Sequence, residues 1–457
     1  MLDLAIRNGI LVLENGVVCG EVGIRDGRIV CIGQEGEIGE ARQTVDAEGK
    51  YIFPGFIDPH VHCWDPGRGI RDDWYYASRA AAAGGITTII EHPLSIPPVK
   101  DEASFALKKR TAGEKSCVDF ALWGALVPDN LKELEKMYAM GAVAFKGFIS
   151  YCNEDYPHIP DSVLYDALRL SRKKGFLLAV HAENAEMADT GEKRMKAQGR
   201  RDPLAHMESR DEIVELEAIN RVIFFTEQTG GHMHIVHMTI AGGAEQIRKA
   251  QQRGVDISAE TCPHYIAADC RLLEERAGFA KCTPPLRRPE NTEAMWEYLR
   301  NGTITMITSD HTDYLYEEKL AAKEDIWACE NGMPGVATLA PLTLDACMNR
   351  HGFSAAETAK LLSTNAAKKF GIYPRKGCLR IGADADFAIV DMGREWIVDG
   401  GKLYYKQKWS PYDGWKIKGA VDKTIVRGKI VYDSGRILAE KGYGRFINPR
   451  EISEESL

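Results

Sequence analysis

The sequence Ile-Phe-Pro-Gly-Phe-Ile-Asp-Pro-His-Val-His occupies residues 52–62 and predicts a buried strand that ends in two histidines. Side chains alternate between the two faces of a strand, so His60 and His62 are expected to project from the same face at its C-terminal end. Because imidazole is a common metal ligand, the end of this strand is a candidate metal-binding position.

This strand is the first of eight apolar segments that alternate with helical stretches, a pattern typical of βα units and a parallel sheet. The eight predicted strands are 52–62, 86–93, 118–126, 142–148, 176–183, 233–239, 255–264 and 303–311. The predicted helices are 74–83, 103–112, 131–140, 162–174, 213–228, 244–253 and 291–300. Eight units favour a closed (β/α)8 barrel with its chemistry at the C-terminal strand ends. The long polar stretch 183–213 is expected to be an excursion that shapes the mouth of the site.

Both ends of the chain have a different pattern, with short apolar runs split by Gly and Asp-Gly turns. We therefore expect the two termini to build one small β-sandwich together. The predicted fold is α/β, with a TIM-type (β/α)8 barrel over residues 54–372 and a β-sandwich domain formed by residues 1–53 and 373–457.

Composition limits the classes of function. The chain of 457 residues has 44% hydrophobic and 27% charged residues, as soluble globular proteins do. Its net charge of −8, without a dense basic run, argues against nucleic acid as a partner. Eleven scattered cysteines without a Cys-x-x-Cys pair favour reduced thiols and a cytoplasmic location. We expect no signal peptide and no membrane span, because the first residues lack the zones of a leader and no run of eighteen apolar residues occurs.

Further metal-ligand residue types lie in other predicted strands, mostly near their C-terminal ends. They are Lys146 in the fourth strand, His181 in the fifth, His237 in the sixth and Asp310 in the eighth. Taken singly, each has an ordinary structural explanation, such as a helix cap for Asp310. Since the strand ends of a closed barrel converge on one mouth, the joint pattern predicts a site for zinc or a similar divalent ion.

Lys146 lies in an otherwise apolar strand, Gly-Ala-Val-Ala-Phe-Lys-Gly-Phe. The usual interpretation is a lysine with a buried stem and an amine that reaches solvent. Burial beside metal ions would instead favour the neutral amine, which can add carbon dioxide. The resulting carbamate would have two oxygens and could bridge two metal ions.

At these positions the chain resembles the cyclic amidohydrolases, a group that includes hydantoinases, dihydropyrimidinases, allantoinases and dihydroorotases. The matching segments are 53–62, Gly84–Thr88, Phe145-Lys146, Val180–Asn184, Glu260–Tyr265, Pro284–Arg287, Ser309–His311 and Gly382–Phe387. They extend over nearly the whole chain, so the resemblance does not rest on one motif.

The resemblance implies two zinc ions bridged by an N6-carboxylated Lys146. It implies that His60, His62, Lys146 and Asp310 bind the first ion, and that Lys146, His181 and His237 bind the second. Asp310 would take a proton from the attacking water and return it to the leaving amide nitrogen. The implied substrate is a small cyclic amide, and the implied assembly is a homo-oligomer, a tetramer or a dimer.

Four residues are expected to contact the substrate. Tyr151, five residues after Lys146, matches a tyrosine with which hydantoinases and dihydropyrimidinases stabilise the reaction intermediate. Asn331 and Thr283 match positions that contact the ring. Trp64 stands where dihydroorotases have an arginine for the substrate carboxylate, so that activity is disfavoured, and Trp64 could instead form an apolar wall.

Other segments resemble allantoinases and L-hydantoinases. They are Asp65-Pro66-Gly67-Arg68, Glu91-His92-Pro93-Leu94 and Trp409-Ser410-Pro411-Tyr412. The leading prediction is a metal-dependent hydrolase that opens a hydantoin-type ring, either a 5-substituted hydantoin or allantoin, to a ureido (N-carbamoyl) acid. The alternatives are an allantoinase proper, a dihydropyrimidinase acting on a six-membered ring, another amidohydrolase reaction such as deacetylation or deamination, and a scaffold relative without activity.

Overall fold

The computed structural model of the protein describes residues 1–452, and ten short parallel strands lie at its centre. They are β6 (Phe56–His62), β7 (Ile86–Glu91), β8 (Asp119–Leu122), β9 (Gly124–Ala125), β10 (Ala144–Phe148), β11 (Leu177–His181), β12 (Met233–Ile235), β13 (Ile257–Thr261), β14 (Ile304–Ile307) and β15 (His311–Thr312). Hydrogen bonds join them into two sheets, in the orders β15-β6-β7-β8 and β14-β13-β12-β11-β10-β9.

Two segments join these sheets into a closed barrel. At one seam β8 pairs with β7 while β9, two residues further on, pairs with β10. At the other seam β14 pairs with β13 and β15 pairs with β6. Each of these segments corresponds to one predicted strand that changes sheets, so the eight predicted strands are present and the predicted barrel is confirmed.

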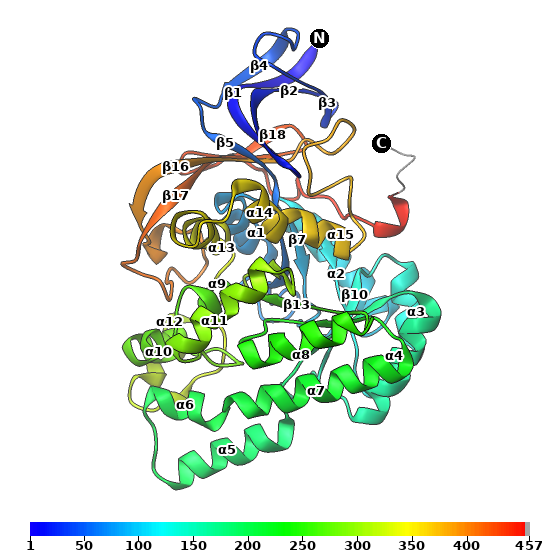
Figure 1. The fold of residues 1–457 in the computed structure, drawn as a ribbon, viewed down its shortest axis with the longest axis vertical. Helices are drawn as coiled ribbons and strands as arrows, with labels where there is room; N and C mark the ends of the chain where they lie inside the picture. Colours follow the sequence, from blue (N-terminus) through cyan, green and yellow to red (C-terminus); the bar gives the residue numbers. More distant parts are fainter. Residues whose placement is uncertain (453–457) are drawn as a thin grey trace.

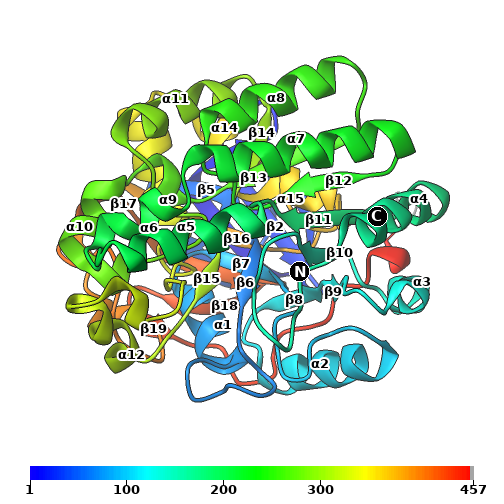
Figure 2. The same ribbon diagram turned by 90° about the horizontal axis from the view of Figure 1, so that it is seen from below.

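Helices surround the strands, as the view from below shows (Figure 2). Seven correspond to the predicted helices, and all their ends lie within three residues of the prediction: α1 (Trp74–Ala83), α2 (Glu102–Lys115), α3 (Leu131–Ala139), α4 (Asp161–Lys174), α7 (Glu212–Thr229), α8 (Ala241–Gln252) and α11 (Pro289–Arg300). Local chemistry fixes several of these ends. Asp101 caps α2 through the backbone N–H of Ser104, and Gly175 and Gly230 end α4 and α7 in the left-handed conformation.

The excursion after β11 holds two helices, α5 (Ala185–Ala197) and α6 (Pro203–Ser209). Shorter helices complete the barrel: α9 (Pro263–Ile266), α10 (Cys270–Arg276), α12 (Tyr316–Leu320), α13 (Leu339–Leu344), α14 (Ala355–Ala359) and α15 (Asn365–Lys369). Among the described residues, no helix is long and apolar enough to cross a membrane.

The two termini form a separate β-layer at the top of the molecule in Figure 1. Its strands are β1 (Leu2–Leu13), β2 (Gly16–Arg25), β3 (Arg28–Gly33), β4 (Ala41–Asp46), β5 (Tyr51–Pro54), β16 (Phe387–Ile397), β17 (Lys416–Val426), β18 (Lys429–Asp433) and β19 (Arg436–Ile437). They form one hydrogen-bonded sheet in which β5 pairs with both β1 and β16. Apolar side chains from both ends, among them Ile24, Ile29, Ile389 and Ile425, share one core.

The structure corrects three further strand predictions, and the first is 233–239, of which only Met233–Ile235 forms a strand, β12. Residues 52–62 form two strands, because the chain leaves β5 in the terminal sheet at Gly55 and enters the barrel as β6. A Cβ atom at Gly55 would lie 2.2 Å from Oγ1 of Thr87, so only glycine fits this crossing. The strand predicted at 255–264 ends at Thr261, because Pro263 begins helix α9.

Candidate metal centre

Six predicted metal ligands come from five strand segments. His60 and His62 lie at the end of β6, Lys146 lies in the middle of β10, and His181 ends β11. His237 follows β12 by two residues, and Asp310 lies between β14 and β15. The four histidines and Lys146 are buried, and the Asp310 side chain is 15% exposed. One possible ligand atom from each of His60, His237 and Asp310 lies within 4.8 Å of the others.

The Asp310 carboxylate links both histidines of β6. Its Oδ1 lies 3.1 Å from Nε2 of His60 and 3.3 Å from Nε2 of His62, so both rings project from the same face of the strand. The backbone at Asp310 and at His237 has positive φ, at 48° and 37°. Such angles are uncommon outside glycine and recur at functional sites, where surrounding structure enforces them.

Two buried glutamates orient the imidazoles. Oε1 of Glu260 lies 2.5 Å from Nδ1 of His60, and Oε2 of Glu183 lies 2.6 Å from Nε2 of His181. A carboxylate accepts the N–H of such a ring, which leaves the other nitrogen with a free lone pair. In His181 that other nitrogen is Nδ1, 3.0 Å from Nε2 of His237. Glu183 thus fixes a tautomer of His181 whose other nitrogen can bind an ion, and Glu260 fixes the orientation of the His60 ring.

Burial and charge set the protonation of the cluster. Burial lowers the pKa of His62 to about 4 and the pKa of His237 well below its usual value, so both rings are neutral at pH 7. Burial also lowers the pKa of His60, but the carboxylates of Asp310 and Glu260 outweigh it and raise that pKa. Burial lowers the pKa of the Lys146 amine to about 8.

The ligand set fits a divalent ion. Within the predicted ligand set, three buried nitrogens make no hydrogen bond among residues 1–452: His60 Nε2, whose 3.1 Å approach to Asp310 is an ion-pair contact, His62 Nδ1 and His237 Nδ1. Buried polar atoms are nearly always paired, so a cluster of unpaired ones requires an explanation. Neutral imidazole nitrogens beside a carboxylate are ligands that zinc and similar ions prefer.

Three of the four predicted substrate contacts have a defined place. Thr283 donates its hydroxyl hydrogen to Oε2 of Glu183, at 2.9 Å, and so touches the carboxylate that orients His181. Oδ1 of Asn331 is buried, with no partner among the described residues. Trp64 is buried with Tyr314 and donates from Nε1 to the backbone oxygen of Asp313, at 3.1 Å.

Tyr151 has a different environment. It lies three residues beyond the end of β10, and its side chain is 66% exposed. The structure therefore does not bury Tyr151 with the histidines. Its predicted role in stabilising an intermediate stays a prediction.

Sequence reasoning did not select three buried residues of this cluster: His92, Glu183 and Glu260. His92 directly follows β7, so the strand-end rule that selected His181 and His237 applies to it equally. Glu260 is a charged residue in the short strand Ile-Ser-Ala-Glu-Thr, and Glu183 is two residues beyond β11. An acidic residue in or directly after a buried strand is the sequence feature that indicates Glu183 and Glu260.

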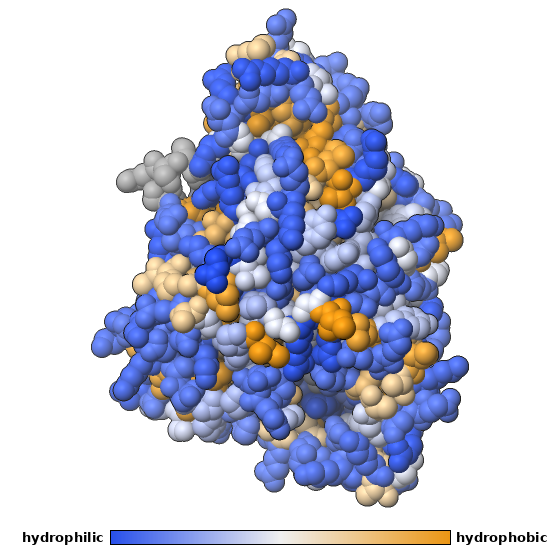
Figure 3. Space-filling view, turned by 180° about the vertical axis from the view of Figure 1, so that it is seen from behind, coloured by the Kyte–Doolittle hydropathy of each residue, from blue (hydrophilic) through white to orange (hydrophobic). Residues whose placement is uncertain are grey.

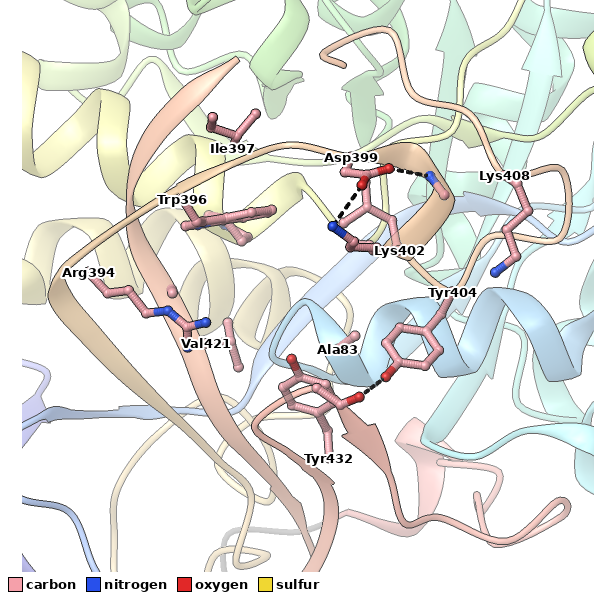
Figure 4. Close-up of a pocket in the computed structure, with 16 residues that line it drawn as sticks. Ala83, Arg394, Trp396, Ile397, Asp399, Lys402, Tyr404, Lys408, Val421 and Tyr432 are labelled. Atoms are coloured by element: carbon pink, nitrogen blue, oxygen red, sulfur yellow. Dashed lines mark hydrogen bonds and ion pairs between the residues drawn. The ribbon is translucent and has the colours of Figure 1, made fainter. Parts of the chain in front are cut away.

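A separate pocket of about 520 Å³ lies between the end of α1, the end of β16 and the middle of β17 (Figure 4). Trp396, Tyr404 and Tyr432 line it, together with the ion pair between Asp399 and Lys402. None of the histidines described above lines this pocket. The pocket and the cluster of predicted metal ligands are therefore two separate places in the fold.

Comparison with known proteins gives one consistent family. The family model described as "Amidohydrolase family" matches residues 51–431. An allantoinase from Bacillus licheniformis is 36% identical over 97% of this chain and 99% of its own length. An L-hydantoinase from Paenarthrobacter aurescens is 35% identical over 98% of this chain and 99% of its own length.

Solved structures agree with these matches. The L-hydantoinase (dihydropyrimidinase) from Arthrobacter aurescens superposes with a TM-score of 0.96 at 35% identity, over 98% of this chain and all of that one. A dihydropyrimidinase from Brevibacillus agri gives a TM-score of 0.92 at 28% identity, over 98% of both chains.

Proposed function

This chain belongs to the amidohydrolase family, and from that premise we propose that it opens a hydantoin-type ring to a ureido (N-carbamoyl) acid. The observation that carries the proposal is the convergence of His60, His237 and Asp310 within 4.8 Å at the C-terminal ends of barrel strands. Active sites of such barrels lie at this end. The named relatives, an allantoinase and an L-hydantoinase, support a cyclic amide as the substrate class.

We propose that two zinc ions occupy the cluster. His60, His62, Lys146 and Asp310 would hold the first, and Lys146, His181 and His237 the second. Bound divalent ions supply polarisation of a carbonyl and a lowered pKa for an attacking water. The unpaired nitrogens of His60, His62 and His237 support this assignment.

Carboxylation of Lys146 would complete the anionic ligands. The neutral amine adds carbon dioxide, a C–N bond forms, and one proton leaves, which gives a carbamate with two oxygens. Burial supports this step, because the pKa of about 8 leaves a useful share of the amine neutral near pH 7.

Asp310 would carry the proton. Its pKa lies well below the usual value despite burial, because His60 and His62 stabilise the carboxylate, so it is ionised at pH 7, the form that a general base requires. Asp310 would take the proton of the attacking water and return it to the leaving ring nitrogen, as a general base and then a general acid.

The size of the substrate ring, five-membered or six-membered, depends on the residues predicted to contact it. Tyr151 and Asn331 are the two residues that favour a hydantoinase over an allantoinase, and the Tyr151 side chain is 66% exposed. We therefore propose the five-membered ring that both activities share, with contacts from Thr283, Asn331 and Trp64. The six-membered ring of a dihydropyrimidinase is the second candidate, supported by the 28% identical dihydropyrimidinase structure.

A rate comparison tests the function. Zinc-loaded protein would be assayed on allantoin, dihydrouracil and both enantiomers of a 5-substituted hydantoin, with chelator-treated protein as the control. We expect the fastest metal-dependent turnover on one of the five-membered rings. Faster opening of dihydrouracil would favour the second candidate, and no metal-dependent opening of any ring would refute the proposal.

Three further features stay proposals. We keep the division into a barrel of residues 54–372 and a terminal domain of 1–53 and 373–457, although Pro54 still pairs with Phe387 in the terminal sheet. A cytoplasmic location is supported by the eleven free cysteines.

A homo-oligomer is supported by Ile213 and Phe224, two exposed apolar side chains on α7. Figure 3 shows separate apolar patches on another face of the molecule, which is mainly hydrophilic.

A further inference from the structure

A small pocket lies where the terminal sheet meets the end of the barrel opposite the predicted metal ligands. Its volume is about 200 Å³, and none of those ligands lines it. Four arginines from four separate segments line it: Arg28 at the start of β3, Arg375 between α15 and β16, Arg427 between β17 and β18, and Arg445 after β19. The lining carboxylates are those of Asp26 and Asp384. Cations therefore outnumber anions in this pocket, although the net charge of the chain is −8.

Arg427 is the buried arginine of this group. Its side chain is 6% exposed and pairs with Asp119, the first residue of β8. Its Nη2 donates to the backbone oxygen of Tyr443 at 2.9 Å, and its guanidinium lies over the Tyr443 ring, 4.5 Å from the centroid. These two hydrogen bonds leave other N–H donors of the guanidinium for a ligand, because the group has five in all. The position of this cation is thus fixed before any ligand binds.

The other arginines of the pocket are only partly neutralised. The carboxylate of Asp384 lies 3.0 Å from both Arg375 and Lys376. Arg28 shares the same carboxylate at 3.8 Å and is 41% exposed. Arg445 is exposed and forms no ion pair among residues 1–452. One carboxylate thus serves three cations while a fourth cation has none, so positive charge remains available for an anion from solution.

We propose that this pocket binds a small tetrahedral oxyanion of the phosphate class. Guanidinium groups donate paired, charge-assisted hydrogen bonds to such anions. A tetrahedral anion presents oxygens in several directions and can meet arginines from four segments, whereas one planar carboxylate matches one or two of them. The volume is below the roughly 300–1,000 Å³ typical of sites for drug-sized ligands, which favours a small anion. The inference does not depend on the proposed function, because none of the proposed metal ligands takes part in it.

Titration calorimetry with inorganic phosphate tests the inference, with chloride keeping the ionic strength constant. Arg445→Gln removes an exposed cation and no ion pair, so the fold should tolerate it. We expect the wild type to bind one phosphate and Arg445→Gln to bind it at least about tenfold more weakly, because charge-assisted donors are lost. Arg28→Gln should show the same loss. Arg436→Gln is the matched control, since Arg436 is an exposed arginine of β19 that does not line the pocket, and it should match the wild type.

Two results would overturn the inference. One is the absence of saturable phosphate binding by the wild type. The other is equal binding by the wild type and all three variants, which would place the anion elsewhere on the protein. Competition then tests the shape of the ligand: sulfate should displace phosphate, and malonate, a dicarboxylate, should not. Malonate that binds as tightly as phosphate would refute the tetrahedral class.

Discussion

The barrel has buried polar clusters at both ends, and they differ in how their charges are paired. At the N-terminal end of β8, Nζ of Lys376 lies 2.6 Å from Asp119, 2.6 Å from Asp386 and 3.0 Å from Asp384. We call these four residues the floor cluster. Arg427 also pairs with Asp119, so each carboxylate of the floor cluster faces a cation. At the opposite end, nitrogens of His60, His62, His92 and His237 have no partner among the described residues.

This difference separates a structural cluster from a reactive one. The floor cluster joins β8 of the barrel to the segment before β16 and to the β17–β18 turn at Arg427, so it ties the terminal sheet to the barrel floor. Its charges are satisfied within the protein, as a stable junction requires. The mouth leaves ligand atoms unsatisfied at the barrel end where catalysis is found, which is expected of a site completed by a bound ion.

Lys146→Ala should give the largest effect at the mouth. Removing the amine would remove the proposed carbamate, and both proposed ion sites would lose a ligand. We expect kcat/KM for ring opening to fall by at least about 10³-fold and the bound zinc to fall, measured by steady-state kinetics and elemental analysis. The unfolding temperature of the metal-free variant should stay close to that of metal-free wild type. Normal zinc content together with a normal rate would defeat the carbamate assignment.

Asp310→Asn should give a loss of about 10²- to 10⁴-fold in kcat with little change in substrate affinity. The amide keeps the shape of the side chain but cannot accept the proton of the attacking water. Pre-steady-state kinetics and equilibrium binding of a ring substrate separate these two effects. Undiminished turnover would remove Asp310 from the role of base.

Lys376→Met should show the reverse pattern. It leaves the carboxylate of Asp386 buried without a cation, while Asp119 keeps Arg427, and removing one partner of a buried pair typically costs about 3–5 kcal/mol of stability. Urea unfolding should detect this loss, while the kcat/KM of the folded fraction stays at the wild-type value. Lys368→Met is the control, because Lys368 forms a half-exposed pair with Glu14 that is worth about 1 kcal/mol or less. A variant that unfolds like wild type would show that the floor cluster is not a stabilising junction.

Thr283→Val should give the smallest effect. It removes the hydroxyl that donates to Glu183 and so loosens the carboxylate that orients His181. We expect zinc affinity to weaken by about tenfold, the lower end of the range for residues behind a ligand, measured by chelator competition. A change in KM without any change in zinc affinity would instead indicate direct contact with substrate.

The sequence pattern predicted the barrel and most of the side chains that lie at its C-terminal end. Residue spacing alone placed His60 and His62 on one face, and the strand-end rule found His181, His237 and Asp310, which the structure brings together. The positions of these side chains could be predicted because strand alternation and barrel closure are local or topological rules, while their role as ligands stays a prediction.

The remaining features depend on tertiary contacts. The stacking of His92 on His60 requires β6 and β7 to lie side by side, and no spacing along the chain encodes it. The break at Gly55 depends on how closely Thr87 approaches, and the exposure of Tyr151 depends on the path of its loop. The sequence indicates which residues are candidates for the site, and tertiary packing determines which of them lie in contact.

The most direct test of the metal centre is anomalous diffraction at the zinc edge, on crystals of protein incubated with zinc and bicarbonate. Our interpretation predicts two zinc peaks at the mouth, one beside His60, His62 and Asp310 and one beside His181 and His237, with extra density on Nζ of Lys146. No zinc peak among these residues in well-ordered crystals would contradict it.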